Sequence, residues 1–131
     1  MGQQQLLLII LGVIVVGIAV AVGITMFTDN AQSANRDAVT NDLVNLASRA
    51  QQYYRRPQAL GGGQGSFVGL QLTQLTSKAV NSNGTYAMGT PTATSVVLTG
   101  TGTETGFDGS TKVKVEMTVW ADSTKITGTT N

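Results

Sequence analysis

Residues 6–27 read LLLIILGVIVVGIAVAVGITMF, from Leu6 to Phe27, without one charged side chain. As an α-helix that rises about 1.5 Å per residue, this stretch spans roughly 33 Å, enough to cross the ~30 Å hydrocarbon core of a bilayer. A surface helix of a soluble domain would carry a polar face at 3.6-residue spacing, and this stretch has none. We therefore expect lipid or protein to surround it on every side.

This stretch has two simpler interpretations, a cleaved signal peptide and a single-pass membrane anchor. A cleaved secretory signal has a basic start, a short apolar core and a small-residue cleavage site. Residues 1–5 (MGQQQ) hold no Lys or Arg and the apolar stretch is long, so the sequence disfavours a signal peptide. A single-pass membrane anchor stays open. Ala19 and Gly23 match the small-xxx-small spacing that lets helices approach closely, which is a weak signal in membrane helices.

A helical pattern continues through residues 31–56, AQSANRDAVTNDLVNLASRAQQYYRR. Apolar residues recur there at three- and four-residue steps, which indicates an amphipathic helix. They are Val39, Leu43, Leu46, Ala50 and Tyr53 or Tyr54. Asp37 and Asp42 are expected to be solvated on the other faces. Because no proline precedes Pro57, one helix of roughly 50 residues is predicted, and Pro57 ends it.

The remaining residues predict a small β-rich head. Residues 61–65, GGGQG, are interpreted as a flexible linker, because they lack the Gly-Lys-Ser/Thr ending of a phosphate-binding loop. A helical turn is expected near Leu72 to Val80. The run Asn81-Ser82-Asn83-Gly84 is a turn signal that favours a tight hairpin.

Short strands are predicted at 86–88, 94–103, 111–121 and 124–128. The clearest is the third, in which apolar residues alternate with polar ones. The apolar positions are Val113, Val115, Met117 and Val119, and the polar ones are Lys112, Lys114, Glu116 and Thr118. The alternation favours an antiparallel sheet with one solvated face, whose dry face covers the apolar stripe of the helix.

Together these elements predict an α+β fold, in which a long N-terminal α-helix with a hydrophobic first half packs on a small C-terminal antiparallel β-sheet. The expected divisions are a hydrophobic transmembrane or filament-core helix (1–28), its amphipathic continuation (29–60), and a glycine-rich loop with a threonine-rich sheet (61–131). The residues expected to pack the helix on the head are Val39, Leu43, Leu46, Tyr53, Val113, Val115, Met117 and Val119.

Composition argues against several functions. Eight basic and seven acidic residues give a net charge of +1, so there is no electrostatic reason to expect a nucleic-acid partner. The absence of Cys and His excludes disulfides, zinc sites built on those residues and His-based catalysis. The carboxylates are scattered, and Asp108-Gly109-Ser110 is interpreted as a turn rather than a calcium loop. No enzyme activity, cofactor or metal is predicted.

The N-terminal segment QQQLLLIILGVIVVGIAVAVGI resembles the first helix of type IV pilins and pseudopilins. These proteins share a hydrophobic helix at the chain start, an amphipathic continuation, a loop and an antiparallel sheet. The resemblance implies a structural subunit of an extracellular type IV pilus-like filament, with a role in adhesion, motility or surface attachment. It also implies a helical homopolymer of this chain, residence in the inner membrane before assembly, a pilus assembly machinery as partner, and a filament on the cell surface.

Two departures from the family pattern concern the N-terminus. The family carries a basic leader that is cut after a glycine, and here Met1-Gly2 is the nearest candidate, without a basic residue. The family also carries a Glu close to its mature N-terminus, for which Gln5 is the nearest match. A buried amide costs less than an unpaired carboxylate, so we hypothesise that Gln3, Gln4 and Gln5 replace ion pairing with hydrogen bonds between subunits.

The filament core is therefore expected to include residues on all faces of the helix. These are Gln3, Gln4, Gln5, Leu6, Ile10, Gly12, Val16, Gly17, Ala19, Gly23 and Phe27.

Two features of the remaining chain are candidate surface sites. Asn83-Gly84-Thr85 matches an N-glycosylation sequon, which makes Asn83 a candidate for modification, although a plain turn is favoured. Tyr53-Tyr54-Arg55-Arg56 is interpreted as helix-to-head packing in preference to a ligand or adhesion site.

Two alternatives to the filament subunit remain open. One is a pseudopilin of a secretion or DNA-uptake system, which forms only short assemblies. The other is a monomeric, single-pass membrane-anchored β-domain that binds a partner. The first differs from a pilus subunit in its abundance on the cell surface, and the second differs in forming no fibre.

Overall fold

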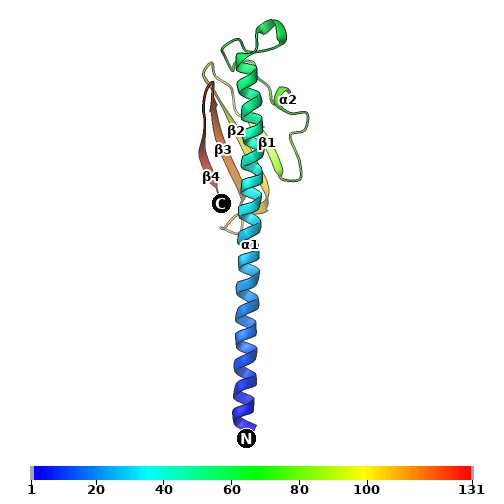
Figure 1. Cartoon of the computed structure of the whole chain (residues 1–131), viewed down its shortest axis with the longest axis vertical. Coiled ribbons are helices and arrows are strands. Elements are labelled where there is room, and N and C mark those ends of the chain that lie inside the picture. The colour runs from blue at the N-terminus through cyan, green and yellow to red at the C-terminus, as the bar shows by residue number, and fades with distance from the viewer. Residues whose placement is uncertain (1, 131) are drawn as a thin grey trace. The chain divides into compact units, whose positions relative to one another are not determined.

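The computed structural model describes residues 2–130. The chain is α+β, with a long N-terminal helix, α1 (Gly2–Arg55), whose second part packs on a four-stranded antiparallel sheet (Figure 1). It divides into two compact units, of which one ends at Ala31 and the other begins at Gln32. Arg55 lies in the last turn of α1, two residues before Pro57, so the helix ends where the proline predicted.

The sheet contains the predicted strands. In the order β1-β2-β3-β4, each strand is antiparallel to the next. The strands are β1 (Gly84–Met88), β2 (Ser95–Thr105), β3 (Lys112–Trp120) and β4 (Thr124–Thr130). The main differences from the predicted bounds are at β1, which begins earlier because Gly84 already pairs with Gly102, and at β4, which continues to Thr130.

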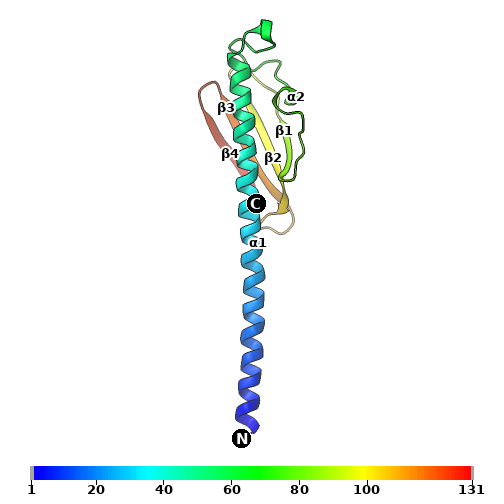
Figure 2. The ribbon, with the colours of Figure 1, turned by 45° about the vertical axis from the view of Figure 1, so that its right-hand side comes forward.

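The core lies between one face of this sheet and the second part of α1. Alternate residues of β3 are buried there, as are Val96 and Leu98 of β2. From the helix, Val39, Leu43 and Ala47 face them, each at most 1% exposed. Figures 1 and 2 show this part of α1, in cyan and green, lying over the same face of the sheet in both views.

Two glycines of β2 allow α1 to approach the sheet closely. A Cβ on Gly100 would lie 2.5 Å from Cγ1 of Val39, and one on Gly102 would lie 2.0 Å from Oδ1 of Asn35. The same Asn35 oxygen accepts a hydrogen bond from the backbone N–H of Thr103 (3.1 Å). Glycine in a strand interior often marks such a close approach.

β4 departs from the simple picture of a sheet with one dry face. Every residue from Thr124 to Thr130 is exposed, although the strand pairs with β3 along its length, with one irregularity between Glu116 and Met117. Its largest apolar side chain, Ile126, is 44% exposed. The helix therefore covers β1 to β3, and β4 extends the sheet past the core.

The segment between α1 and β1 holds two short helices. A 3-10 helix covers Gln58–Leu60, and α2 covers Leu72–Leu75. The helical turn expected up to Val80 stops early, because Thr76 is extended (φ −150°, ψ 141°). Val80 instead pairs with Thr85 in an isolated antiparallel bridge.

The glycine-rich residues predicted as a linker form a cap on the carboxyl end of α1. The last carbonyls of a helix lack partners within the helix. Here the N–H groups of Gly63 and Gly65 donate to the carbonyls of Tyr53 and Tyr54, both at 2.8 Å. Phe67, two residues after Gly65, is fully buried in the core, and its ring centroid lies 4.8 Å from that of Tyr54.

Candidate functional site

The first candidate site is the hydrophobic part of α1. Its large apolar side chains are between 51% (Val22) and 76% (Phe27) exposed, on all faces of the helix. The helix is long and apolar enough to cross a membrane, with a mean hydropathy of 3.2 over its best window. Thr25 and Thr28 donate their hydroxyls to carbonyls one turn earlier (3.0 Å each), so these hydroxyls need no water.

The predicted filament-core residues all lie in this segment. Each of Gln3, Gln4, Gln5, Leu6, Ile10, Gly12, Val16, Gly17, Ala19, Gly23 and Phe27 is exposed. A Cβ on Gly12, Gly17 or Gly23 would meet nothing within 4 Å. No packing within the described chain therefore requires glycine at these three positions, each of which costs about 1 kcal/mol in a helix interior.

The predicted helix-to-head residues lie in the second unit. The structure buries seven of them: Val39, Leu43, Leu46, Val113, Val115, Met117 and Val119. Tyr53 is half-buried against the same core. Its hydroxyl donates to the Val68 carbonyl (3.2 Å), so this tyrosine joins α1 to the segment after the glycines.

Asp42 is not the solvated residue that the helical pattern predicted. The side chain is half-buried, and its Oδ2 atom accepts hydrogen bonds from three residues: Asn81 and Asn83, both at 3.0 Å, and the Tyr86 hydroxyl. Burial raises the pKa of this carboxyl, but the three hydrogen bonds outweigh it, so the pKa lies below its ordinary value. Burial and the bond to Asp42 raise the pKa of the Tyr86 hydroxyl.

Sequence reasoning missed this cluster because its members are distant in the chain. The turn predicted at residues 81–84 is present, and the Asn81 side-chain oxygen accepts hydrogen bonds from the N–H groups of Asn83 and Gly84. Nothing local to Asp42 shows that this turn folds against it. The backbone carbonyl of the sequon residue Asn83 also accepts a hydrogen bond from the side-chain amide of Asn35 (2.8 Å), so a glycan would have to fit into a part-buried network.

The acidic side chains are spread over the chain. Within residues 2–130 no three of them gather into a group that could hold a metal ion. The Asp108 carboxylate accepts hydrogen bonds from the backbone N–H groups of Ser110 (3.1 Å) and Thr111 (3.0 Å). This pattern is typical of a turn. These bonds, with that from the Thr111 hydroxyl as the largest cause, lower the pKa of the Asp108 carboxyl.

No protein-family model, curated protein or solved structure matches this chain significantly. The resemblance to type IV pilins therefore rests on the hydrophobic N-terminal segment and on the order of the elements. What the structure adds is an α+β arrangement of the kind that the resemblance implied, and a helix that could anchor in a membrane.

Proposed function

We propose that this chain is the structural subunit of an extracellular type IV pilus-like filament that polymerises through Leu6–Phe27 of α1 and serves adhesion, motility or surface attachment. The observation that carries the proposal is the exposure of this apolar segment on every face. At about 25 cal/mol per Å² of buried apolar surface, leaving such a segment in water is prohibitive. Lipid covers it before assembly, and copies of the same helix cover it in the filament.

The three glycines favour copies of the helix over lipid alone. Helix backbones approach closely in an apolar medium where small residues meet. Gly12, Gly17 and Gly23 have open space around them within this chain, so the contact that would use them lies outside it. A contact between unlike surfaces of identical subunits that does not close into a ring generates a helical fibre.

The competing functions use the same segment differently. A monomeric anchored β-domain needs only lipid around Leu6–Phe27. In that case no helix–helix contact explains why three glycines occur in this segment. A pseudopilin of a secretion or DNA-uptake system makes the same helix contacts in a short assembly. Abundance of fibres on the cell surface separates the pilus subunit from the pseudopilin.

Electron microscopy of material sheared from the cell surface, with mass spectrometry of the same fraction, tests the proposal. We expect abundant thin filaments that contain this chain, and the mass of the N-terminal peptide reports its processing. A chain found only in the membrane fraction as a monomer would replace the filament by the anchored β-domain. Rare, short fibres attached to the envelope would favour the pseudopilin.

Cysteine cross-linking adds a test of the interface itself, since the chain has no Cys of its own. Ile10 and Ile24 lie on the exposed apolar segment, and both are replaced by Cys in one variant. Oxidation of a staggered polymer is expected to give a ladder of products larger than a dimer. The control is Lys78→Cys combined with Lys125→Cys, two exposed positions of the head, and this variant is expected to give no ladder.

A further inference from the structure

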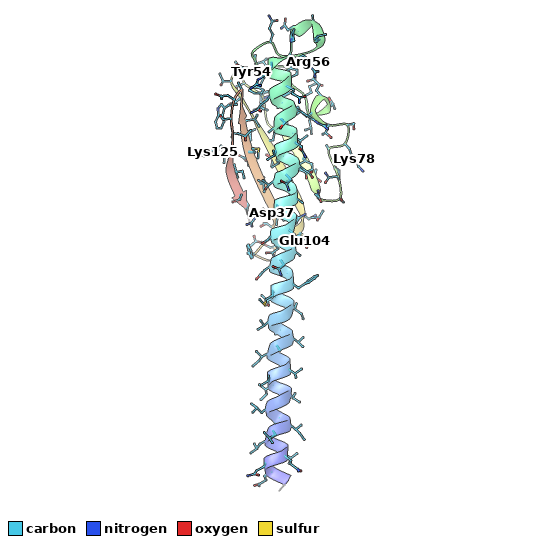
Figure 3. The ribbon with its side chains drawn as sticks, in the orientation of Figure 1. Asp37, Tyr54, Arg56, Lys78, Glu104 and Lys125 are labelled. Atoms are coloured by element: carbon cyan, nitrogen blue, oxygen red, sulfur yellow. The ribbon has the colours of Figure 1, made fainter. Side chains whose placement is uncertain are left out.

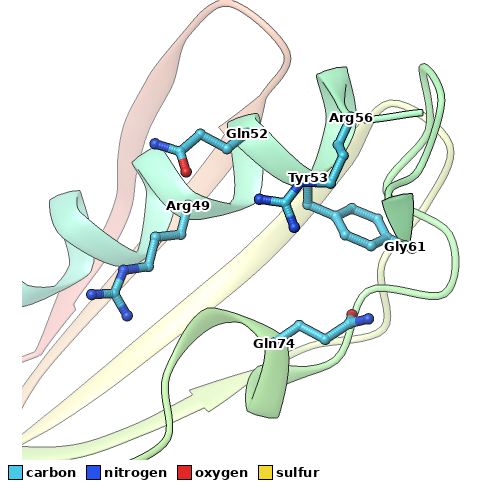
Figure 4. Close-up of a pocket in the computed structure, with 6 residues that line it drawn as sticks. All are labelled: Arg49, Gln52, Tyr53, Arg56, Gly61 and Gln74. Atoms are coloured by element: carbon cyan, nitrogen blue, oxygen red, sulfur yellow. The ribbon is translucent and has the colours of Figure 1, made fainter. Parts of the chain in front are cut away.

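A pocket of about 440 Å³ opens at the carboxyl end of α1, beside α2. Figure 4 shows the side chains of Arg49, Gln52, Tyr53 and Arg56 leaving the same stretch of α1, with Gln74 on the neighbouring short helix. Gly61 completes the lining. The volume falls within the roughly 300–1,000 Å³ that is usual for small-molecule sites.

The charged side chains that line this pocket are all positive. Two guanidinium groups line it, and no carboxylate is among its lining residues. Asp37 and Glu104 lie toward the other end of the sheet from Arg56, as Figure 3 shows. Asp42 shares a smaller neighbouring hollow with Arg49, but its Oδ2 atom is already engaged by Asn81, Asn83 and Tyr86.

Contacts within the head hold three of the lining side chains in place. Arg49 Nη1 donates to the Leu75 carbonyl at 2.6 Å, which leaves its other N–H groups for a ligand. Gln74 Oε1 accepts the N–H of Gln71 at 2.9 Å, so the amide nitrogen is the free end of that side chain. Tyr53 is held through its bond to Val68. Side chains fixed before binding lose less entropy when a ligand arrives.

We propose that this pocket binds a short acidic oligosaccharide, with uronic-acid carboxylates on Arg49 and Arg56. The planar guanidinium matches a carboxylate with two parallel hydrogen bonds. The two arginines are separated by two turns of α1, about 10.5 Å along the helix axis, which suits successive charged groups on an extended ligand better than one compact phosphate. Gln52 and Gln74 offer amides to hydroxyls, and the Tyr53 ring offers an apolar wall.

The pocket lies within the second unit, so the inference does not depend on filament formation. The test is calorimetric titration of the full chain, purified in a non-ionic detergent, with trigalacturonate. The fully methyl-esterified trisaccharide is the matched ligand, because it keeps the sugars and removes the charge. Inorganic phosphate is the third ligand, and it distinguishes an acidic sugar from a general anion.

We expect saturable binding of trigalacturonate, at least about tenfold weaker binding of the ester, and a loss of about tenfold in Arg56→Gln, the size of one charge-assisted hydrogen bond. Arg55→Gln removes the same charge one residue away, where the guanidinium donates to the Ala121 carbonyl (3.3 Å), and binding should change less than about twofold. Equal losses in the two variants, equal binding of the ester, or equally tight binding of phosphate would each overturn the proposal.

Discussion

The hydroxyl of Tyr86 in β1 donates a hydrogen bond to the Asp42 carboxylate of α1, two residues that lie 44 positions apart in the chain. Tyr86 is 4% exposed, so the bond forms at the margin of the core. The same carboxylate oxygen accepts hydrogen bonds from the side-chain amides of Asn81 and Asn83 in the preceding turn. This single side chain therefore ties the entry of the sheet to the helix.

Removing the hydroxyl should weaken the head without changing its fold. In Tyr86→Phe the ring stays in the core and one hydrogen bond to a charged acceptor is lost, so we expect a loss of about 1–2 kcal/mol in the free energy of unfolding. The measurement is urea unfolding of the full chain in non-ionic detergent, followed by the fluorescence of its one Trp. Unchanged stability would show that water replaces the bond at no cost.

Acid should weaken the same connection. Because the folded-state pKa of Asp42 lies below its ordinary value of 3.8, its contribution is complete above that value and is lost as the pH falls through the lower folded value. Asp42→Asn should therefore flatten part of the fall in stability below about pH 4. Asp37→Asn, at an exposed position of the same helix, is the matched control. Equal acid profiles for Asp42→Asn and the unsubstituted chain would contradict the assignment.

The contact between α1 and β2 predicts a coupled pair. In Gly100→Ala the new Cβ would overlap Cγ1 of Val39, and overpacking of this kind costs about 1–3 kcal/mol. In the double variant with Val39→Ala the overlap with Val39 disappears and only the tight contact with the Tyr86 ring (3.1 Å) remains, so the two losses should not add. Gly128→Ala is the control, because its Cβ would meet Glu116 at an ordinary 3.7 Å. Additive losses across this cycle would mean that the helix does not lie on Gly100.

The glycine cap should be sensitive at Gly63 and tolerant at Gly61. A Cβ on Gly63 would lie 1.8 Å from the Ser66 carbonyl oxygen, so Gly63→Ala must move the backbone that caps α1. We expect a loss of about 1–3 kcal/mol in the free energy of unfolding. Gly61 has φ +77° and open space, a conformation that Asn tolerates, so Gly61→Asn should be close to neutral. A neutral Gly63→Ala would argue against the cap.

The polar start of α1 carries a prediction that rests on the proposed filament. If amide hydrogen bonds join subunits, Gln5→Leu should lower the yield of sheared filaments and leave the amount of membrane-inserted chain unchanged. Val13→Leu, a small apolar change on the same exposed helix, should alter neither quantity. Both quantities are measured by immunoblot of the sheared and membrane fractions. A normal filament yield for Gln5→Leu would remove the proposed role of the amides.

The sequence was most informative where one periodicity runs unbroken. Alternation along residues 113–119 predicted which side chains of β3 are buried, and the steps from Val39 to Ala50 did the same for α1. Both patterns depend only on the geometry of a single element, with period 2 in a strand and 3.6 in a helix. The long apolar segment predicted a membrane-capable helix for the same reason, since its length and composition are local properties.

Tertiary structure decided everything that required two distant segments to meet. The glycines at 61–65 look like a linker in sequence, and only the approach of their N–H groups to the end of α1 makes them a cap. Asp42 looks solvated until the turn at Asn81 folds against it, and the pocket between Arg56 and Gln74 exists only because α2 returns to α1. Local patterns report which face of an element is apolar, whereas hydrogen bonds and hollows depend on which elements become neighbours.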